Sequence, residues 1–546
     1  MKSICLLLAL LPALVLAQDP GYSCDPSTCR LPTCQCASTS PPGGLSPVGL
    51  VPSPASSLIA VRTIGSGVSW IRSIIGPIFL DRILLVLSET PQFIVFTADD
   101  AIQSYTLDAV NQFLAHRRNP NGCAPKMTYF TSLGFTNYTL VTDWYAAGNE
   151  IADHTMTHVG SPSVEEINGN LITLNALGGV PLSAIKGFRA PYLDFTPETL
   201  RILQDSGFLY DSSASTTTPV TDPNTDAYWP YTLDNGLANN CMTTPGVCNG
   251  QPKLPGLWEI PMYAFFDDRG VRGPHLMDPW LDRANGNNAP DDAATLRFMQ
   301  RTFTDHYSGN KQPIGLYTHP IHVSLSYPGV TVSRSTIDMI NRFLDWAQEE
   351  HDNVWIVSNE QLLDWVRNPV PASQVGSLPS FQCEPVRPQR SQQICNGIPG
   401  NQDGLLARCG FSEFPFFTCY GCPSTLPTPM NPNPAQAAGQ PVRYRVPANC
   451  STTFWDPIEG RCTCTSGDCA FSDVERNIGP DGTPYVGGGT GGGPMFGPRL
   501  PSGTGLYDEP AMPTDDTISS ANLVTPSLLS TSIFLTSMFS ALAYVW

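Results

Sequence analysis

The chain has little positive charge. Its 546 residues include 29 Lys and Arg against 47 Asp and Glu, which gives a formal net charge of −18 at pH 7. A protein that binds a nucleic acid needs a basic face to neutralise phosphates, so this balance argues against a nucleic-acid partner. A neutral polysaccharide is compatible with an acidic protein. The length is too great for one ordinary domain.

Histidine is scarce, with eight in the chain, whereas cysteine is plentiful, with 17. No histidine lies near the four clustered cysteines at Cys24, Cys29, Cys34 and Cys36, so disulfides are favoured there over a metal site. Removing Cys5 with a leader peptide leaves 16 cysteines, an even number. This usage indicates an oxidising compartment.

The first 17 residues are typical of a secretory signal. Lys2 precedes an apolar run over 4–16, and small residues at 15–17 predict cleavage before Gln18. A short membrane anchor is the alternative, but the run is well under the ~20 residues that a spanning helix needs.

The last residues resemble a glycosylphosphatidylinositol signal. Small residues at 519–521 and a mixed spacer at 522–527 precede an uncharged, mostly apolar tail at 528–546. A C-terminal transmembrane helix is the alternative, although no Lys or Arg follows the tail. We therefore expect a secreted, extracellular protein that a lipid anchor holds at the plasma membrane or in the cell wall.

No internal segment is both long and apolar without charge. The run at 68–87 contains Arg72, Asp81 and Arg82, which argue against a spanning helix. Residues 47–90 are left as an insertion of unknown role. An amphipathic membrane-surface helix, a capping helix and a gene-model error are all open interpretations.

Residues 91–367 alternate short apolar runs with amphipathic stretches. The predicted strands are 93–97, 127–131, 150–153, 185–189, 208–212, 257–261, 314–318 and 354–358. The predicted helices are 105–116, 141–147, 164–177, 197–205, 292–306 and 335–348. This alternation predicts a parallel sheet, most simply a barrel, with its chemistry at the carboxyl ends of the strands.

Smaller segments flank this region. Residues 18–46 form a cysteine-rich leader, and residues 383–469 hold nine cysteines with several aromatic residues. The second segment is predicted to be a disulfide-stapled module, either a structural spacer or a glycan-binding unit. Residues 478–518 are rich in Gly and Pro and are typical of a flexible stalk. Glycosylation sequons begin at Asn137 and Asn449.

Five short segments carry candidate chemistry, each beside a predicted strand. They are Thr-Ala-Asp-Asp at 97–100, His-Thr-Met-Thr-His at 154–158, Arg-Ala-Pro-Tyr at 189–192, Asp-Ser-Ser at 211–213 and Leu-Tyr-Thr-His at 316–319. His154 and His158 are four apart, so we expect them to share one side of a helical turn and to bind one ion. A carboxylate from Asp99 or Asp100 would complete a site that keeps an open position. Core or surface histidines, and a helix N-cap for the aspartates, are the structural alternatives.

The five segments together resemble those of the polysaccharide deacetylases, carbohydrate esterase family four. The match is nearest to the secreted chitin deacetylases, whose leader is similar to Cys24 through Cys36 and the Pro-Gly-Gly-Leu at 42–45. The resemblance covers residues 24–46 and 91–367. It implies an α/β fold, a distorted (β/α) barrel of the polysaccharide deacetylase type, flanked by small disulfide-rich segments.

The resemblance also implies roles for individual residues. The metal ligands are Asp100, His154 and His158, with zinc as the expected metal and cobalt as an alternative. The catalytic residues are Asp99 as the base, Arg189 orienting that base, Tyr192 holding the oxyanion through its backbone N–H, Asp211 supporting the arginine network and His319 as the general acid.

Two departures from the family pattern stand out. Ala98 replaces the usual Phe of the first motif, and no Trp adjoins Asp211. Trp229, Tyr231 or Trp258 could supply an aromatic wall for the acetyl group, although core packing is at least as good an interpretation of them. His322 is a rival to His319 as the general acid.

The predicted function is the removal of N-acetyl groups from chitin-type polymers of N-acetylglucosamine. The same machinery would serve an esterase that acts on O-acetylated xylan. A third hypothesis is a non-catalytic wall protein that binds glycan.

Overall fold

The computed structural model describes residues 21–47, 89–239, 250–267, 274–281, 291–327, 333–383, 405–412, 415–440, 443–445, 455–458 and 461–462. The predicted signal (1–17), nearly all of the insertion (47–90), the stalk (478–518), the anchor signal (519–546) and the Asn449 sequon lie outside these residues. Among the helices described, none is long and apolar enough to cross a membrane.

A sheet of nine strands forms the centre of the fold. Its strand order is β6-β7-β5-β4-β3-β2-β1-β8, and β9 also pairs with β1. All pairs are parallel except β6 with β7. The strands are β1 (Gln92–Asp100), β2 (Thr128–Thr131), β3 (Glu150–Asp153), β4 (Gly187–Phe188), β5 (Tyr210–Asp211), β6 (Tyr231–Thr232), β7 (Trp258–Glu259), β8 (Ile314–Thr318) and β9 (Val354–Val357).

The central strand β1 pairs with three other strands. β9 pairs with the first half of β1 and β2 with its second half, while β8 pairs along its middle. The prediction of an α/β fold with a distorted barrel is therefore confirmed, as a curled, half-barrel sheet.

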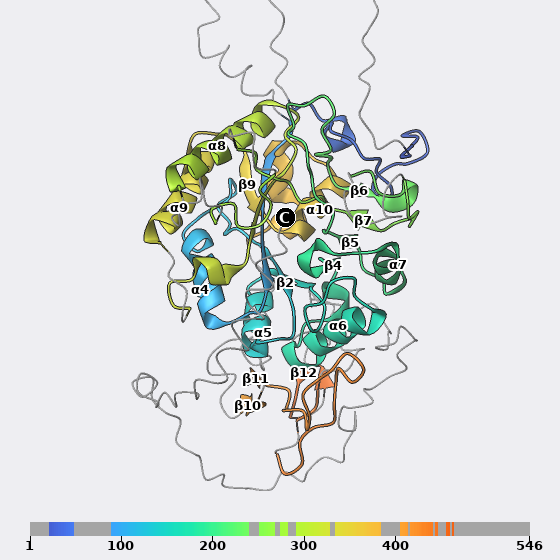
Figure 1. Cartoon of the computed structure of the whole chain (residues 1–546), viewed down its shortest axis with the longest axis vertical. Coiled ribbons are helices and arrows are strands. Elements are labelled where there is room, and N and C mark those ends of the chain that lie inside the picture. The colour runs from blue at the N-terminus through green and yellow to red at the C-terminus, as the bar shows by residue number, and fades with distance from the viewer. Residues whose placement is uncertain are drawn as a thin grey trace, which may run out of the picture. The chain divides into compact units, whose positions relative to one another are not determined.

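Helices surround this sheet (Figure 1). They are α4 (Ser104–Leu114), α5 (Tyr138–Ala146), α6 (Val164–Gly178), α7 (Pro197–Asp205), α8 (Asp292–Ser308), α9 (Arg334–Glu349) and α10 (Asn359–Arg367). The eight predicted strands and six predicted helices are all present, with bounds that differ by a few residues. β6 and α10 were not predicted.

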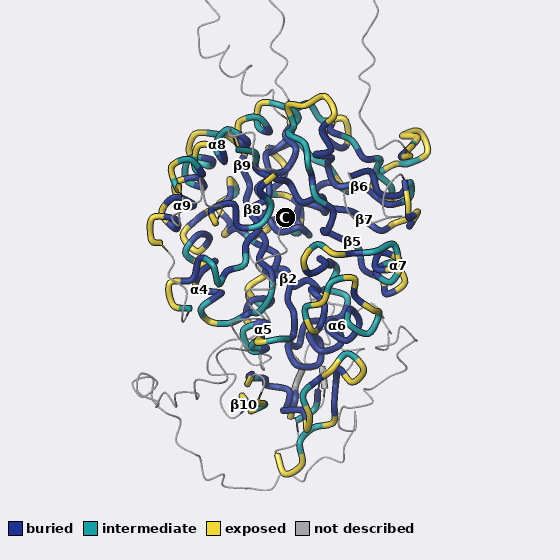
Figure 2. Tube along the Cα trace, viewed as in Figure 1, coloured by how far each residue is buried: buried dark blue, intermediate teal, exposed yellow. Residues whose placement is uncertain are grey.

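The central strand β1 separates two cores, which explains its unbroken apolar run. Phe93 and Val95 belong to the core enclosed by the curled sheet. Ile94, Phe96 and Ala98 belong to the core between the sheet and the helices. A parallel strand that is buried on both faces has no polar face, so it reads as continuous hydrophobic sequence. In Figure 2 the labelled strands of the central sheet are drawn as buried.

The helix α10 fills part of the enclosed core. Its Trp365 lies edge-on to Phe93, with ring centroids 5.1 Å apart, and 5.5 Å from the ring of Trp229. Ser358 caps the helix by accepting a hydrogen bond from the backbone N–H of Gln361. Trp229 and Trp258 are therefore core residues, as is Tyr231, and the core-packing interpretation of all three is confirmed.

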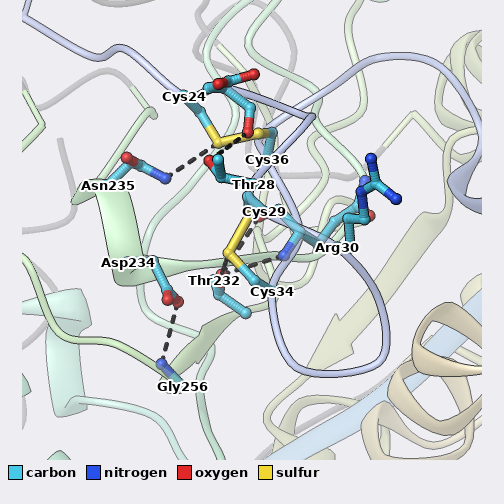
Figure 3. The surroundings of a disulfide bond; sticks show 12 residues. Cys24, Thr28, Cys29, Arg30, Cys34, Cys36, Thr232, Asp234, Asn235 and Gly256 are labelled. Carbon is cyan, nitrogen blue, oxygen red and sulfur yellow. Dashed lines mark hydrogen bonds between the residues drawn. A yellow bond between two sulfur atoms is a disulfide. The ribbon is translucent and has the colours of Figure 1, made fainter.

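The cysteine-rich leader covers the edge of the sheet. Disulfides join Cys24 to Cys36 and Cys29 to Cys34, as Figure 3 shows. The backbone N–H of Thr232 in β6 donates to Gln35 O at 2.9 Å. The leader thus occupies backbone groups that an open edge strand would expose.

Part of the predicted cysteine module packs against α5 and α6. It contains the paired strands β10 (Ala407–Cys409) and β11 (Phe416–Thr418). A disulfide joins Cys409 of β10 to Cys422, which follows β11. The Thr418 hydroxyl donates to Leu177 O at 2.8 Å, and the buried ring of Phe416 lies 5.2 Å from that of Tyr138. A further disulfide joins Cys123, which precedes β2, to Cys383, which follows the central region.

Candidate metal-dependent active site

One transverse row of residues crosses the sheet at its carboxyl edge. Asp100 pairs with Thr131, Thr131 with Asp153, Asp153 with Phe188, and Phe188 with Asp211. The residues that follow each strand therefore emerge at the same level on the same edge. This register brings the first four predicted segments together, although they are spread over more than a hundred residues of sequence.

The three predicted metal ligands converge at this edge. Asp100 Oδ1 lies 3.0 Å from His158 Nε2 and 3.7 Å from His154 Nε2. One donor atom from each residue lies within 4.8 Å of the others. This convergence favours a shared ligand set over unrelated core or surface histidines.

The backbone that carries the histidines is not the helical turn expected from their spacing. Residues 154–158 form a loop, in which Thr155 has a φ of 61° and His158 a φ of 57°. This left-handed region is incompatible with a right-handed helix. The N–H of Thr155 donates to Asp153 Oδ1 at 2.8 Å, which stabilises the loop instead. The prediction of convergence is confirmed and its helical explanation is wrong.

The helix N-cap interpretation of the aspartates is also wrong. The following helix α4 begins at Ser104, and its N-cap is Gln103. Asp100 has a φ of 83°, so the chain turns sharply at the end of β1. This turn directs Asp99 and Asp100 to separate partners.

The donor set fits a divalent transition metal. Among the described residues, the buried Oδ1 of Asp100 has no hydrogen-bond partner of good geometry, although it faces two imidazoles. His154 Nδ1 lies 2.7 Å from Arg189 O, so this ring donates there and leaves Nε2 as the ligand atom. The nearby histidines, above all His158, hold the pKa of Asp100 well below its ordinary value, against the opposing effect of burial. Two neutral imidazoles and one carboxylate are a ligand set that zinc accepts.

Asp99 is held by a fully buried arginine. Arg189 Nη1 donates to Asp99 Oδ1 and to the Thr97 hydroxyl, both at 2.8 Å. Its Nε donates a hydrogen bond to the carbonyl oxygen of Ser212 at 3.0 Å, and its Nη2 donates to the hydroxyl of Ser212 at 3.2 Å. The guanidinium also stacks 4.1 Å from the ring centre of Phe130. Arg189 therefore fixes one carboxylate oxygen of Asp99 and leaves the other, Oδ2, 4.0 Å from His154.

Asp211 supports this arginine through its neighbours rather than by direct contact. Asp211 accepts hydrogen bonds from the hydroxyl of Ser213 at 2.7 Å and from its N–H at 3.1 Å. The same hydroxyl accepts from the N–H of Ala190 at 2.9 Å, next to Arg189. Burial raises the pKa of Asp211 to about 6. Asp211 thus holds the turn whose Ser212 binds the guanidinium.

His319 follows β8 and forms a second cluster beside the first. Its Nδ1 lies 2.6 Å from Asp278 Oδ2, and the same oxygen lies 3.2 Å from His322 Nδ1. The other oxygen of Asp278 accepts from the Thr318 hydroxyl at 2.7 Å. Burial alone would lower the pKa of His319, but Asp278, followed by Asp100 and Asp99, raises this pKa to about 10.

Asp278 was not among the residues predicted from the sequence. The family pattern has an acidic residue beside a tryptophan, which Asp211 lacks. An Asp-Pro-Trp sequence at 278–280 does place an acidic residue close to a tryptophan. The N–H of Asp278 donates to Tyr317 O at 2.9 Å, which places this loop against the end of β8. This contact joins residues about 40 apart in the sequence. No periodic pattern of apolar residues predicts that the two segments lie together.

The remaining predicted features lie at the rim or in the core. Tyr192 has a φ of 60°, is 62% exposed, and places its ring 4.9 Å from that of His158. Its predicted oxyanion contact stays a prediction. Ala98 lies in the helix-side core, so the missing Phe changes packing there and not the site itself.

Comparisons with known proteins agree with this arrangement. No family model matches the chain. Chitin deacetylase 8 of Bombyx mori is 27% identical over 443 residues, which span 79% of this chain and 98% of that protein. Chitin deacetylase 1 of Bombyx mori is 27% identical over 365 residues, which span 62% of each chain.

Solved structures of low similarity include two carbohydrate-active enzymes. A family 4 carbohydrate esterase from Streptomyces lividans is 14% identical, with a TM-score of 0.26 over 48% of this chain and 91% of that one. The catalytic domain of a peptidoglycan N-acetylglucosamine deacetylase from Eubacterium rectale is 11% identical, with a TM-score of 0.26 over 52% and 92%.

The strand-end site brings together an Asp-His-His group that could hold a divalent metal. The chain is homologous to chitin deacetylases, and this homology implies a hydrolase that acts on carbon–nitrogen bonds.

Proposed function

We propose that this protein removes N-acetyl groups from chitin-type polymers in a metal-dependent hydrolysis. One observation carries the proposal: the Asp100, His154 and His158 cluster lies beside an aspartate, Asp99, that a buried arginine holds. A bound divalent metal, zinc by its ligand type and cobalt as an alternative, would acidify a water molecule and polarise the acetyl carbonyl.

Asp99 is placed to act as the general base. Arg189 holds Asp99 Oδ1, so the proton of the attacking water goes to the free oxygen, Oδ2. Because Arg189 is itself fully buried and bonded through all three of its nitrogens, the base is held in one orientation.

His319 is placed to act as the general acid. An amide cannot release its nitrogen as an anion at neutral pH, so the leaving amine needs a proton. The Asp278 carboxylate keeps that proton on His319, and the 2.6 Å contact fixes the ring through Nδ1. Nε2 is then the atom that delivers the proton. His322 shares the carboxylate at the longer distance of 3.2 Å, which favours His319 for this role.

The N-acetyl substrate is supported by the names of the relatives. Both curated relatives are chitin deacetylases, and one of them is matched over 98% of its length. An esterase acting on O-acetylated xylan would use the same base and metal, so the choice of the amide rests on the relatives. A non-catalytic glycan-binding protein would not need the Arg189–Asp99 pair.

We also propose an extracellular location. Four disulfides are present among the described residues, and such bonds persist in oxidising compartments. A lipid anchor at the plasma membrane or in the cell wall remains a hypothesis from the sequence. Release of the protein from cells by a phosphatidylinositol-specific phospholipase would support the anchor, and retention in the cell after that treatment would contradict it.

The proposed activity is tested by acetate release. Secreted protein that lacks residues 519–546 is incubated with chitin oligomers and, separately, with acetylated xylan. Asp99→Asn and His154→Ala are measured beside the wild type, and an exposed histidine variant, His116→Gln, serves as the matched control.

We expect acetate from the chitin oligomers with the wild type and His116→Gln, and none with the other two variants. If acetate is released from acetylated xylan and not from chitin oligomers, the protein is an esterase and the proposed amide substrate is wrong. Glycan binding without acetate from either substrate would favour the wall-binding alternative.

A further inference from the structure

A second group of metal-ligating side chains lies beside the first. Asp278, His319 and His322 each offer one donor atom, and these three atoms lie within 4.8 Å of one another. Both imidazoles direct Nδ1 at the same carboxylate oxygen, Asp278 Oδ2, at 2.6 Å and 3.2 Å. The proposed reaction uses His319 and Asp278, but it gives His322 no task.

We propose that Asp278, His319 and His322 form a second, weaker site for a divalent transition metal, and that its occupation inhibits the enzyme. The inhibitory part of this inference rests on the proposed function, whereas the binding part does not. Excess zinc would then switch off the protein that a first zinc ion activates.

The geometry suits an ion that shares these three ligands. Around a tetrahedral zinc with bonds of about 2.0–2.1 Å, neighbouring ligand atoms lie roughly 3.3 Å apart. The Asp278–His322 contact of 3.2 Å already has that spacing, and the 2.6 Å Asp278–His319 contact needs a small opening. Imidazole and carboxylate are ligands that zinc and cobalt both accept.

The site is anchored on one side and open on the other. The Asp278 side chain is 4% exposed, and its second oxygen, Oδ1, accepts from the Thr318 hydroxyl and the His319 N–H. These bonds orient Oδ2 toward the histidines, as the outer hydrogen bonds of metal ligands commonly do. The side chains of His319 and His322 are 30% and 31% exposed, so an ion can enter from solvent and keep a water ligand.

Two features make this site weaker than the first. His319 Nδ1 already contacts Asp278 Oδ2 at 2.6 Å, so an ion must open this contact to bind. The two sites also lie at neighbouring strand ends, because Ala98 pairs with Thr318, Asp100 ends β1 and His319 follows β8. Like charges repel, so the first ion lowers the affinity of the second.

Occupation removes the general acid. An imidazole that holds a metal ion cannot also be an imidazolium, so His319 has no acidic proton to give to the leaving amine. The Asp278 carboxylate, which otherwise raises the proton affinity of His319, is bound to the ion at the same time. Inhibition therefore follows whichever ring nitrogen coordinates.

The binding test uses the secreted protein, stripped of metal and then dialysed against increasing zinc or cobalt. We expect the wild type to bind two equivalents, the second more weakly. His322→Gln should retain the first equivalent and lose roughly tenfold or more in affinity for the second. Asp100→Asn should lose the first equivalent and keep the second. His116→Gln, which changes an exposed histidine after α4, should match the wild type.

The activity test measures acetate release at one equivalent of zinc and then with increasing excess. Each variant is compared with its own activity at one equivalent. Excess zinc should inhibit the wild type and His116→Gln, at concentrations that fill the second site, and should inhibit His322→Gln only at roughly tenfold higher concentration. His322→Asp, which offers another ligand, should regain inhibition.

Three results would overturn the inference. The first is a wild type that binds one equivalent only. The second is a His322→Gln variant that binds the second equivalent as tightly as the wild type. The third is inhibition by excess zinc that is unchanged in His322→Gln. If no protein releases acetate, the proposed function fails while the dialysis still decides whether the second site exists.

Discussion

Replacing Asp278 by Asn removes the charge that keeps His319 protonated. The substitution preserves the size of the side chain and an oxygen that can accept the hydrogen bond from Nδ1. It removes the negative charge 2.6 Å from the ring. Because that carboxylate makes the largest contribution that raises the pKa of His319, we expect this pKa to fall from about 10 toward its ordinary value.

The size of the effect follows from the fraction of protonated His319. With a pKa of about 10 the wild-type ring is almost fully protonated at pH 8. With the ordinary value of about 6.5, only ~3% of the variant carries the proton at pH 8, a loss of about 30-fold in kcat/KM. At pH 6 about three quarters remain protonated, so the loss is less than about twofold. His319 is 30% exposed, and solvent screening makes these figures upper limits.

The assay is the pH profile of kcat/KM for acetate release at one equivalent of zinc. The alkaline limb of Asp278→Asn should move toward neutral pH, and its acidic limb should stay in place. Asp226→Asn is the matched control, because Asp226 is also buried but bonds to Thr217 and Thr218 instead of a histidine. An alkaline limb that does not move in Asp278→Asn would refute the role given to this carboxylate.

Three further changes test the framework around the site. Thr97→Val removes an acceptor of the buried Arg189 and should lower the unfolding free energy by about 1–3 kcal/mol in denaturant titrations at pH 7; an unchanged midpoint would contradict the hydrogen bond. Burial, and then the charge of Glu360, raises the pKa of Glu150 to about 7, so its contribution to stability is full below its unfolded pKa and is lost as pH rises through 7. Glu150→Gln should therefore flatten the decline of about 3 kcal/mol in unfolding free energy between pH 5 and 9, and a slope equal to that of the wild type would show that Glu150 is not its source. The double variant Cys123→Ser/Cys383→Ser opens a bond that spans 260 residues and should cost about 3–5 kcal/mol by thermal unfolding, whereas an unchanged melting temperature would mean that the bond contributes nothing.

Much of the fold is predictable because its patterns are local. The continuous apolar run of β1 and the amphipathic helices after it identify a parallel sheet without any long-range information. β6 was missed because it is two residues long and pairs antiparallel at the edge. α10 was missed because it begins two residues after β9, so its apolar residues look like a continuation of the strand.

The site was predictable where residues follow directly on strands. Asp99, Asp100, His154 and Arg189 are brought together by the register of the sheet, which the strand pattern already implies. The shape of the 154–158 loop was not predictable, because left-handed φ values at Thr155 and His158 leave no mark on residue spacing.

Asp278 was not predictable for a different reason. It reaches His319 from an irregular loop, which a single bridge between Met277 and Tyr317 holds against β8. Asp211, which the family resemblance linked to the arginine, supports that arginine through Ser212 and Ser213. The acid that acts on His319 is thus supplied by a separate loop, which only the three-dimensional structure identifies.

The most direct test of the central claim is acetate release from chitin oligomers by metal-free protein to which zinc is returned. The account predicts no acetate without metal, full activity at one equivalent of zinc, and no recovery in Asp100→Asn at that zinc level. Undiminished acetate release from the metal-free protein would contradict the role of the Asp100, His154 and His158 centre, as would full recovery of Asp100→Asn.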